Sequence, residues 1–64
     1  MPLIQVQVLE GRSSEQISRL IQQLTISAVE SLEVKPEQVR VIVNEVPKSH
    51  WGVGGVTKET LDRK

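Results

Sequence analysis

The sequence predicts an α+β subunit in which one long helix connects two parallel strands and a short hairpin follows. Three observations support this fold class. Residues 3–9 and 39–46 have strand-like patterns, residues 14–32 have the spacing of an amphipathic helix, and glycines gather at 52–55. Because a strand–helix–strand crossover is right-handed and joins parallel strands, we expect the two strands to form a parallel pair.

The first strand is predicted over residues 3–9. Its apolar face alternates with a mixed one, and the apolar side chains are Ile4, Val6 and Val8. Gln5 and Gln7 lie on the mixed face, so ordinary core does not cover that side. The segment 10–12 then breaks the alternation and turns the chain.

A helix is predicted to begin after Ser13 and to end near Leu32–Glu33. Ser13 with Gln16 three residues later is typical of a capping box. Pro36 disfavours helical backbone at the residue before it, which limits the helix at its other end. One apolar stripe runs along the helix: Ile17, Leu20, Ile21, Leu24, Ala28 and Leu32. Ile26 falls off this stripe, so we expect it to be exposed.

The second strand is predicted from Val39 to Val46, where β-branched residues dominate, and Pro47 ends it. One face carries Val39, Val41 and Val43, and the other carries Arg40, Ile42 and Asn44. Residues 48–51 are predicted as a loop and 52–56 as a tight hairpin or bulge in which glycines supply positive φ. We expect residues 57–64 to form a short turn or a frayed tail.

The 64 residues leave room for one domain, which we assign to residues 1–64, and a chain this short is marginal on its own. It has no cysteine for disulfides and a single histidine, His50, so neither disulfides nor a metal is expected to stabilise it. Its hydrophobic content is 38%, with one aromatic residue. We therefore expect self-association that extends the sheet across subunits.

Several functional classes lose support from the charge pattern and hydropathy. Eight basic and eight acidic residues give a net charge of zero, which argues against a nucleic-acid partner. No run approaches the ~20 apolar residues that cross a bilayer, and the start does not resemble a signal peptide. We expect a cytoplasmic protein that contacts neither membrane nor nucleic acid.

Pro2 is the candidate general base. Removal of Met1 would leave a secondary amine in a rigid ring at the start of a strand. An α-amino group has a pKa near ~7.7–8.0, and an apolar pocket or a nearby cation lowers it by disfavouring the charged form. Such an amine is a free base near neutral pH. A Met–Pro start without functional meaning is the competing interpretation, and Pro2 taken alone favours it.

Arg12 and Arg40 strengthen the functional interpretation. Arg12 follows the turn after the first strand, and Arg40 lies near the start of the second, inside an apolar segment where a charge needs a reason. A guanidinium pairs bidentately with a carboxylate, so both are candidate substrate ligands. In a parallel pair they lie at opposite ends, so they would converge only between subunits. Surface salt bridges are the alternative.

The loop 50–55 offers weaker candidates. Trp51 is the only aromatic residue, and it forms either a pocket wall or an oligomer contact. His50 has no evident orienting partner, and Glu45 fits a strand-end charge better than an acid catalyst. The glycine run lacks the lysine and helix of a phosphate loop, so we interpret it as backbone geometry.

Four segments in order resemble the 4-oxalocrotonate tautomerase family over nearly the whole chain. They are Pro2-Leu3-Ile4, Leu9-Glu10-Gly11-Arg12-Ser13, Val39-Arg40-Val41-Ile42 and His50-Trp51-Gly52-Val53-Gly54-Gly55. The resemblance implies a tautomerase-like βαβ subunit, sheets joined into dimers, and a homohexamer built as a trimer of dimers. It also implies a cofactor-independent isomerase of aromatic compound catabolism.

The same resemblance implies roles for individual residues. Pro2, freed of Met1, would move a proton between the oxygen and carbon of a 2-hydroxydienoate or enolpyruvate-type acid. Arg12 and Arg40, from neighbouring subunits, would bind the substrate's carboxylates and polarise its carbonyl oxygen. Trp51 would close an apolar pocket with Leu9 and Val53.

Two other functions stay open from the sequence. A haloacrylate dehalogenase or hydratase on the same scaffold would usually need an additional acidic residue to activate water, and we place none. A non-catalytic assembly protein would use neither arginine.

Overall fold

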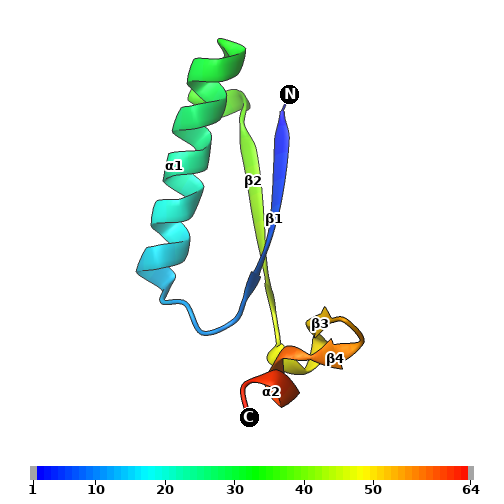
Figure 1. Cartoon of the computed structure of the whole chain (residues 1–64). Coiled ribbons are helices and arrows are strands. Elements are labelled where there is room, and N and C mark those ends of the chain that lie inside the picture. The colour runs from blue at the N-terminus through cyan, green and yellow to red at the C-terminus, as the bar shows by residue number, and fades with distance from the viewer. Residues whose placement is uncertain (1, 64) are drawn as a thin grey trace.

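The computed structural model describes residues 2–63 and shows an elongated, two-layered molecule measuring 45 × 24 × 13 Å. One helix lies along the two long strands, and the C-terminal elements gather beyond one end of the strand pair (Figure 1). In chain order the elements are β1 (Leu3–Leu9), α1 (Ser14–Leu32), the 3₁₀ turn η1 (Pro36–Gln38), β2 (Arg40–Val46), the 3₁₀ turn η2 (Lys48–His50), β3 (Gly52–Val53), β4 (Val56–Thr57) and α2 (Lys58–Leu61).

The parallel pair predicted from the sequence is confirmed. β1 and β2 align from Leu3 opposite Arg40 to Leu9 opposite Val46. The alternation along both strands separates two faces. The half-buried, helix-facing side carries Ile4, Val6, Val8, Val41 and Val43, and the exposed side carries Leu3, Gln5, Gln7, Arg40, Ile42 and Asn44. We call this exposed side the open face.

The core of the single chain is small. Within the described chain only Ala28 and Val39 are buried, each with 8% of its surface exposed. On the open face Leu3 remains 56% exposed and Ile42 45% exposed, so one helix covers only half of the sheet. The apolar side chains of the open face are therefore in contact with water, and a second layer that buried them would lower the free energy.

Both ends of α1 have identifiable causes. The Ser13 hydroxyl accepts the Gln16 N–H at 3.1 Å and the Gln16 side chain accepts the Ser13 N–H at 3.0 Å, which confirms the capping box. The predicted end is also correct, but Pro36 does not cause it. Glu33 adopts left-handed backbone, with φ at 54°, and its N–H donates to the carbonyl of Val29.

The hairpin is confirmed, and its turn residues Gly54 and Gly55 have φ of 60° and 86°. The loop predicted at 48–51 contains the turn η2.

Residues 57–64 were predicted to form a short turn or a frayed tail, but Lys58–Leu61 form the helix α2. Lys64 lies outside the described residues. The Thr57 hydroxyl caps α2 by accepting the Thr60 N–H at 3.2 Å. Asp62 then forms an ion pair with Lys58 of α2 at 3.0 Å and another with Lys48 at 2.8 Å, and the pair with Lys48 ties the end of α2 to η2.

Between residues 2 and 63 the structure contains no helix with the length and apolar character that a bilayer crossing requires.

Replacing Ser13 with Ala should lower the free energy of unfolding by about 1 kcal/mol, because the Gln16 N–H loses the hydroxyl that accepts its hydrogen bond. Urea unfolding at constant protein concentration measures this effect. Ser13→Asp keeps an acceptor at the cap and should stay near the parent value. Equal losses in both variants would contradict the role of the cap.

The Asp62 ion pairs predict how the C-terminal segment responds to pH. Hydrogen bonds from Lys48 and then Lys58 hold the pKa of the Asp62 carboxyl below its usual value, while the hydrogen bond to Asp62 raises the pKa of Lys48. The carboxylate's contribution is therefore present above its ordinary pKa of about 3.9 and is lost as pH falls through the lowered value. The lysine's contribution is lost only at alkaline pH, as pH rises through its raised value.

Trp51 reports this segment because its carbonyl accepts the Lys58 N–H at 2.7 Å. Tryptophan fluorescence should change below about pH 4, as the Asp62 carboxylate takes up a proton. Asp62→Asn should show the altered signal already at neutral pH and lose this acidic step. An unchanged acidic step in Asp62→Asn would assign the transition to another group.

Candidate active site

Pro2 and Arg40 lie at the same end of the strand pair. The backbone N–H of Arg40 donates to the carbonyl of Pro2 at 3.0 Å, so the first residue before β1 is tied to the first residue of β2. Pro2 is half-buried, while Arg40 is exposed. The chain thus holds the Pro2 ring beside the start of the sheet.

The side chain of Arg40 folds back onto the turn that precedes β2. Its Nη1 donates to the carbonyl of Glu37 at 2.6 Å and, at 3.4 Å, to that of Val39. Within residues 2–63 its Nε and Nη2 make no hydrogen bond and it has no ion pair. The guanidinium therefore keeps one edge of donors for a ligand.

Pro2 and Arg40 of one chain do not converge on a common point. Arg40 belongs to the open face, opposite to that of Val39. Continuing the register back by one residue places Pro2 beside Val39, whose side chain faces the helix. The two candidate side chains of a single chain therefore leave the sheet on opposite sides.

Arg12 lies at the other end of the strand pair. The ladder extends one bond past β1, where the Glu10 N–H donates to the carbonyl of Val46 at 3.0 Å, and Gly11 then turns the chain with φ of 113°. Only glycine adopts this backbone freely. Arg12 follows this bend and directly precedes Ser13, the N-cap of α1. Arg12 is exposed and makes no side-chain hydrogen bond or ion pair among the described residues.

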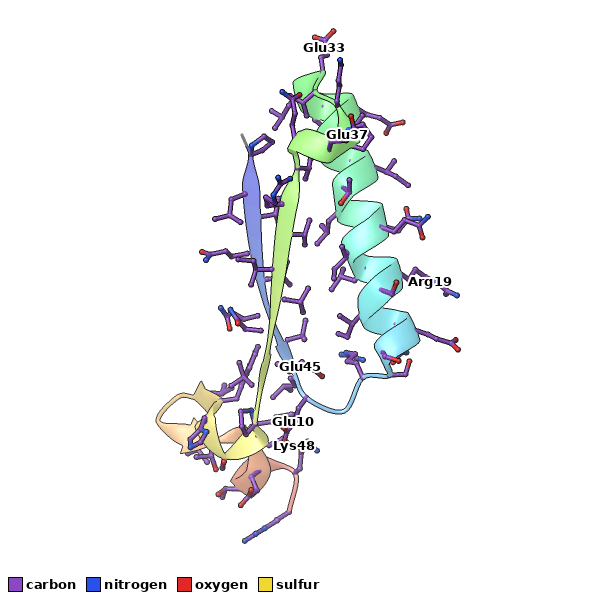
Figure 2. The ribbon with its side chains drawn as sticks, turned by 180° about the vertical axis from the view of Figure 1, so that it is seen from behind. Glu10, Arg19, Glu33, Glu37, Glu45 and Lys48 are labelled. Carbon is purple, nitrogen blue, oxygen red and sulfur yellow. The ribbon has the colours of Figure 1, made fainter. Side chains whose placement is uncertain are left out.

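Labelled side chains mark the two ends. Glu37, from the Arg40 turn, lies at the end where β1 begins, whereas Glu10 and Lys48 lie at the opposite end (Figure 2). From Leu3 to Leu9 the strand spans about 20 Å at a rise of about 3.3 Å per residue.

The three predicted pocket residues also lie at the Arg12 end. Leu9 closes β1, and Trp51 and Val53 belong to the segment that gathers beyond the strand ends (Figure 1). Leu9 and Trp51 are half-buried, while Val53 is 51% exposed. Within one chain Leu9, Arg12, Trp51 and Val53 thus lie at one end of the strand pair, and Pro2 and Arg40 lie at the other.

From the sequence we interpreted His50, Glu45 and the glycine run as structural rather than catalytic. His50 is exposed at the end of η2 and makes no side-chain hydrogen bond within residues 2–63. Glu45 is exposed at the strand end where Glu10 also lies (Figure 2). The positive φ values of Gly54 and Gly55 show that the glycine run serves the hairpin.

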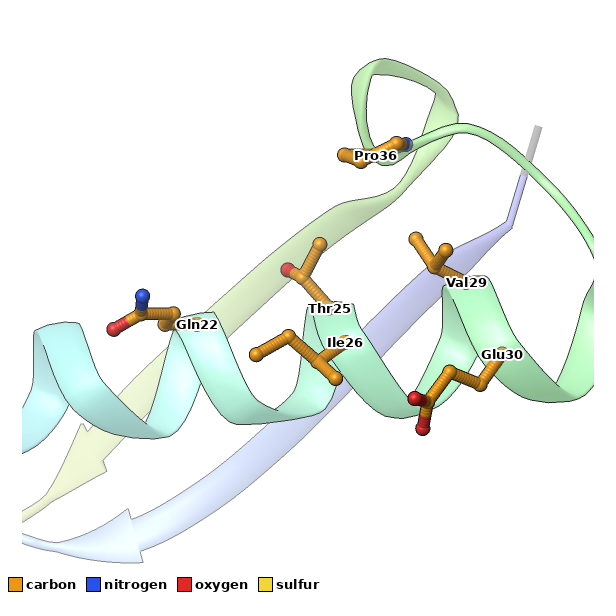
Figure 3. Close-up of a pocket in the computed structure, with 6 residues that line it drawn as sticks. All are labelled: Gln22, Thr25, Ile26, Val29, Glu30 and Pro36. Carbon is orange, nitrogen blue, oxygen red and sulfur yellow. The ribbon is translucent and has the colours of Figure 1, made fainter.

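An open hollow of about 410 Å³ lies beside α1 and η1, and none of the predicted site residues lines it (Figure 3). Ile26, which is 42% exposed as predicted from its position off the stripe, forms part of its wall. The lining residues are Gln22, Thr25, Ile26, Val29, Glu30 and Pro36. This hollow offers a single carboxylate and no cationic group, so it is unsuited to an acidic substrate.

Residues 2–63 contain no group of three or more His, Cys, Asp or Glu side chains placed to hold a metal ion.

Sequence reasoning missed the contact between Arg40 and the turn η1. The Glu37 group that accepts from Arg40 is a backbone carbonyl, which leaves no residue-type signature. The only available signal was Pro36 followed four residues later by the strand, a spacing compatible with a 3₁₀ turn.

Comparisons with known proteins agree on one family. The family model described as tautomerase enzyme matches residues 2–61. The 2-hydroxymuconate tautomerase of Pseudomonas putida is 44% identical over 63 residues, which cover 98% of this chain and 100% of the relative.

Two solved structures have the same fold. TomN, a 4-oxalocrotonate tautomerase homologue in the tomaymycin biosynthetic pathway, matches with a TM-score of 0.96 and 43% identity, covering 98% of this chain and 97% of that chain. A heterohexameric 4-oxalocrotonate tautomerase from Chloroflexus aurantiacus matches with a TM-score of 0.90 and 41% identity, covering 95% and 98%.

The parallel strand–helix–strand unit with its C-terminal hairpin is thus the fold of these enzymes. The chain belongs to the tautomerase family and is an isomerase.

Proposed function

We propose that the chain is a tautomerase of enol acids whose active site is assembled from several copies, with the Pro2 amine as the base. The observation that carries this proposal is the placement of the candidate groups at two ends of the sheet, about 20 Å apart. A single chain does not bring its own base and both arginines to one point, so the proposed site needs contacts among several copies of the chain.

The proposed reaction is ketonisation of a 2-hydroxydienoate or enolpyruvate-type acid. With Met1 removed, the neutral Pro2 nitrogen takes the hydroxyl proton and becomes an ammonium. The same group then returns a proton to a carbon of the conjugated system, so the amine is restored in each turnover. In a Met1–Pro2 amide the nitrogen has no basic lone pair, so that form is inactive.

Arg12 and Arg40 are proposed to bind the carboxylates and to stabilise charge that develops on the substrate oxygen. The free Nε–Nη2 edge of Arg40 suits a carboxylate, because its two donors match two carboxylate oxygens. A guanidinium also stabilises a dienolate oxygen in a site that excludes water.

Leu9, Trp51 and Val53 are proposed to form the apolar wall that keeps the amine dry. Burial against such a wall disfavours the ammonium form and so favours a free base. The half-exposed Val53 of one chain is available for contact with the Pro2 end of another.

We further propose a homohexamer built as a trimer of dimers, in which the open face and the sheet edges contact other copies. The small core and the exposed Leu3 and Ile42 support association. The heterohexameric relative from Chloroflexus aurantiacus supports the same number of subunits.

The proposed setting is a single 64-residue domain in the cytoplasm that uses no cofactor and acts in the catabolism of aromatic compounds. The similarity to 2-hydroxymuconate tautomerase supports a dienol diacid as the first substrate to assay.

Replacing Pro2 with Ala should lower kcat/KM for ketonisation of 2-hydroxymuconate by about 10²- to 10⁴-fold, because a flexible primary amine replaces the secondary amine that the ring holds in position. The assay follows the ultraviolet absorbance of the dienol, and intact mass identifies the preparation that lacks Met1. A preparation that retains Met1 should be equally inactive. Activity of Pro2→Ala at the parent level would overturn the assignment of the base. Halide release from a 3-haloacrylate without ketonisation would instead favour a dehalogenase.

Arg12→Ala and Arg40→Ala should each lower kcat/KM by about a hundredfold, because each removes a charged donor from the developing charge or a carboxylate. Arg19→Ala is the matched control: Arg19 is an exposed arginine of α1 outside the proposed site and should keep full activity. Parent activity in both site variants would favour a non-catalytic assembly protein.

A further inference from the structure

We propose that Gln38 is a positioning residue that holds the Arg40 guanidinium in place by closing the turn η1. The inference rests on the proposed function, because it assigns a purpose to Gln38 only if Arg40 binds substrate.

Gln38 closes η1 with a reciprocal pair of hydrogen bonds. Its side-chain Oε1 accepts the Lys35 N–H at 3.0 Å, and its own N–H donates to the Lys35 carbonyl at 2.9 Å. Pro36 begins the turn with a restricted φ, and the Val39 N–H donates to the Pro36 carbonyl at 3.1 Å. The turn is therefore held at both ends before β2 begins.

The closed turn leaves one carbonyl for Arg40. The carbonyls of Lys35 and Pro36 accept backbone N–H groups, whereas that of Glu37 accepts no backbone N–H within residues 2–63. It accepts Nη1 of Arg40 instead, at 2.6 Å. The hydrogen bond from the Lys35 N–H to the Gln38 side chain closes the turn between residues 35 and 38, and Glu37 lies inside this closed turn. The Gln38 side chain therefore helps to fix the direction of the Glu37 carbonyl.

Anchoring at Nη1 has a chemical consequence for recognition. A free arginine side chain samples many rotamers, and binding a carboxylate would have to order them. With Nη1 held by the backbone, the remaining Nε–Nη2 edge is already oriented as a two-donor fork. Such preorganisation raises affinity without adding a contact to the substrate.

A purely structural role for Gln38 is the competing explanation, and two substitutions separate the two. Gln38→Met keeps the length of the side chain and removes the acceptor, while Gln38→Glu keeps an acceptor for the Lys35 N–H. We expect Gln38→Met to lower kcat/KM by about tenfold, which corresponds to loss of the hydrogen bond between the charged Arg40 guanidinium and the Glu37 carbonyl. Gln38→Glu should recover most of this loss. Gln23→Met is the matched control, since Gln23 is exposed on α1 and makes no side-chain hydrogen bond in the described chain.

A double-mutant cycle with Arg40→Gln tests whether Gln38 acts through Arg40. If Gln38 acts through Arg40, Gln38→Met has no further effect on kcat/KM in the Arg40→Gln background. As a single substitution, Gln38→Met should then change the same parameter, kcat or KM, that Arg40→Gln changes. Multiplicative losses in the double variant would overturn the proposal.

Nuclear magnetic resonance of the Arg40 Nε–Hε group supplies a readout that needs no activity. We expect a rigid signal in the parent protein and in Gln38→Glu, and a mobile signal in Gln38→Met, with oligomer mass and thermal midpoint recorded for each variant. An equally rigid Arg40 in Gln38→Met would overturn the inference. The two proposals fail separately: an active Pro2→Ala overturns the proposed function, whereas an inactive Pro2→Ala with a fully active Gln38→Met overturns only the role of Gln38.

Discussion

The parallel pairing of β1 with β2 is the constraint on which the rest of the structure depends. Because both strands run the same way, the connection must return along the full length of the sheet, and α1 fills that path over one face. Residues 2–63 leave the opposite face uncovered. The same pairing places the end of β1 and the start of β2 at opposite ends of the sheet, where Arg12 follows β1 and Arg40 begins β2.

Local backbone features then decide how each arginine is presented. Gly11 turns the chain in a conformation that other residues avoid, so Arg12 follows a sharp bend and precedes a capped helix. Arg40 is presented differently, because the turn η1 offers it a carbonyl. Among the described residues Arg12 is thus exposed without a hydrogen-bond partner, whereas a backbone carbonyl restrains Arg40.

Much of the fold was predictable because short-range patterns encode it. Alternation gave the first strand with its observed bounds, and the Ser13–Gln16 pair gave the start of α1. The C-terminal helix was not predictable, because Asp62 meets Lys48 only after the hairpin has folded back. Glu33 in left-handed backbone also carried no signal, since glycine is the residue usually found there.

The candidate site was predictable as a set of residues but not as a geometry. Proline at position 2 and the two arginines stood out by their chemistry, and parallel pairing correctly separated the arginines. The contact of Arg40 with a main-chain oxygen was invisible, because any residue at position 37 supplies the same atom. The proposed convergence of the two ends would depend on surfaces of other copies, which one sequence does not describe.

The separation of Pro2 from Arg12 along β1 has a genetic consequence. When a site draws its base from one chain and its arginine from another, two defective chains are able to repair each other. A mixed assembly of chains that lack only the proline and chains that lack only the distal arginine contains some sites in which both groups are intact. Alleles of such a gene would therefore complement one another within a single assembly, and a duplicated copy could lose one half of the site while the shared sites keep working.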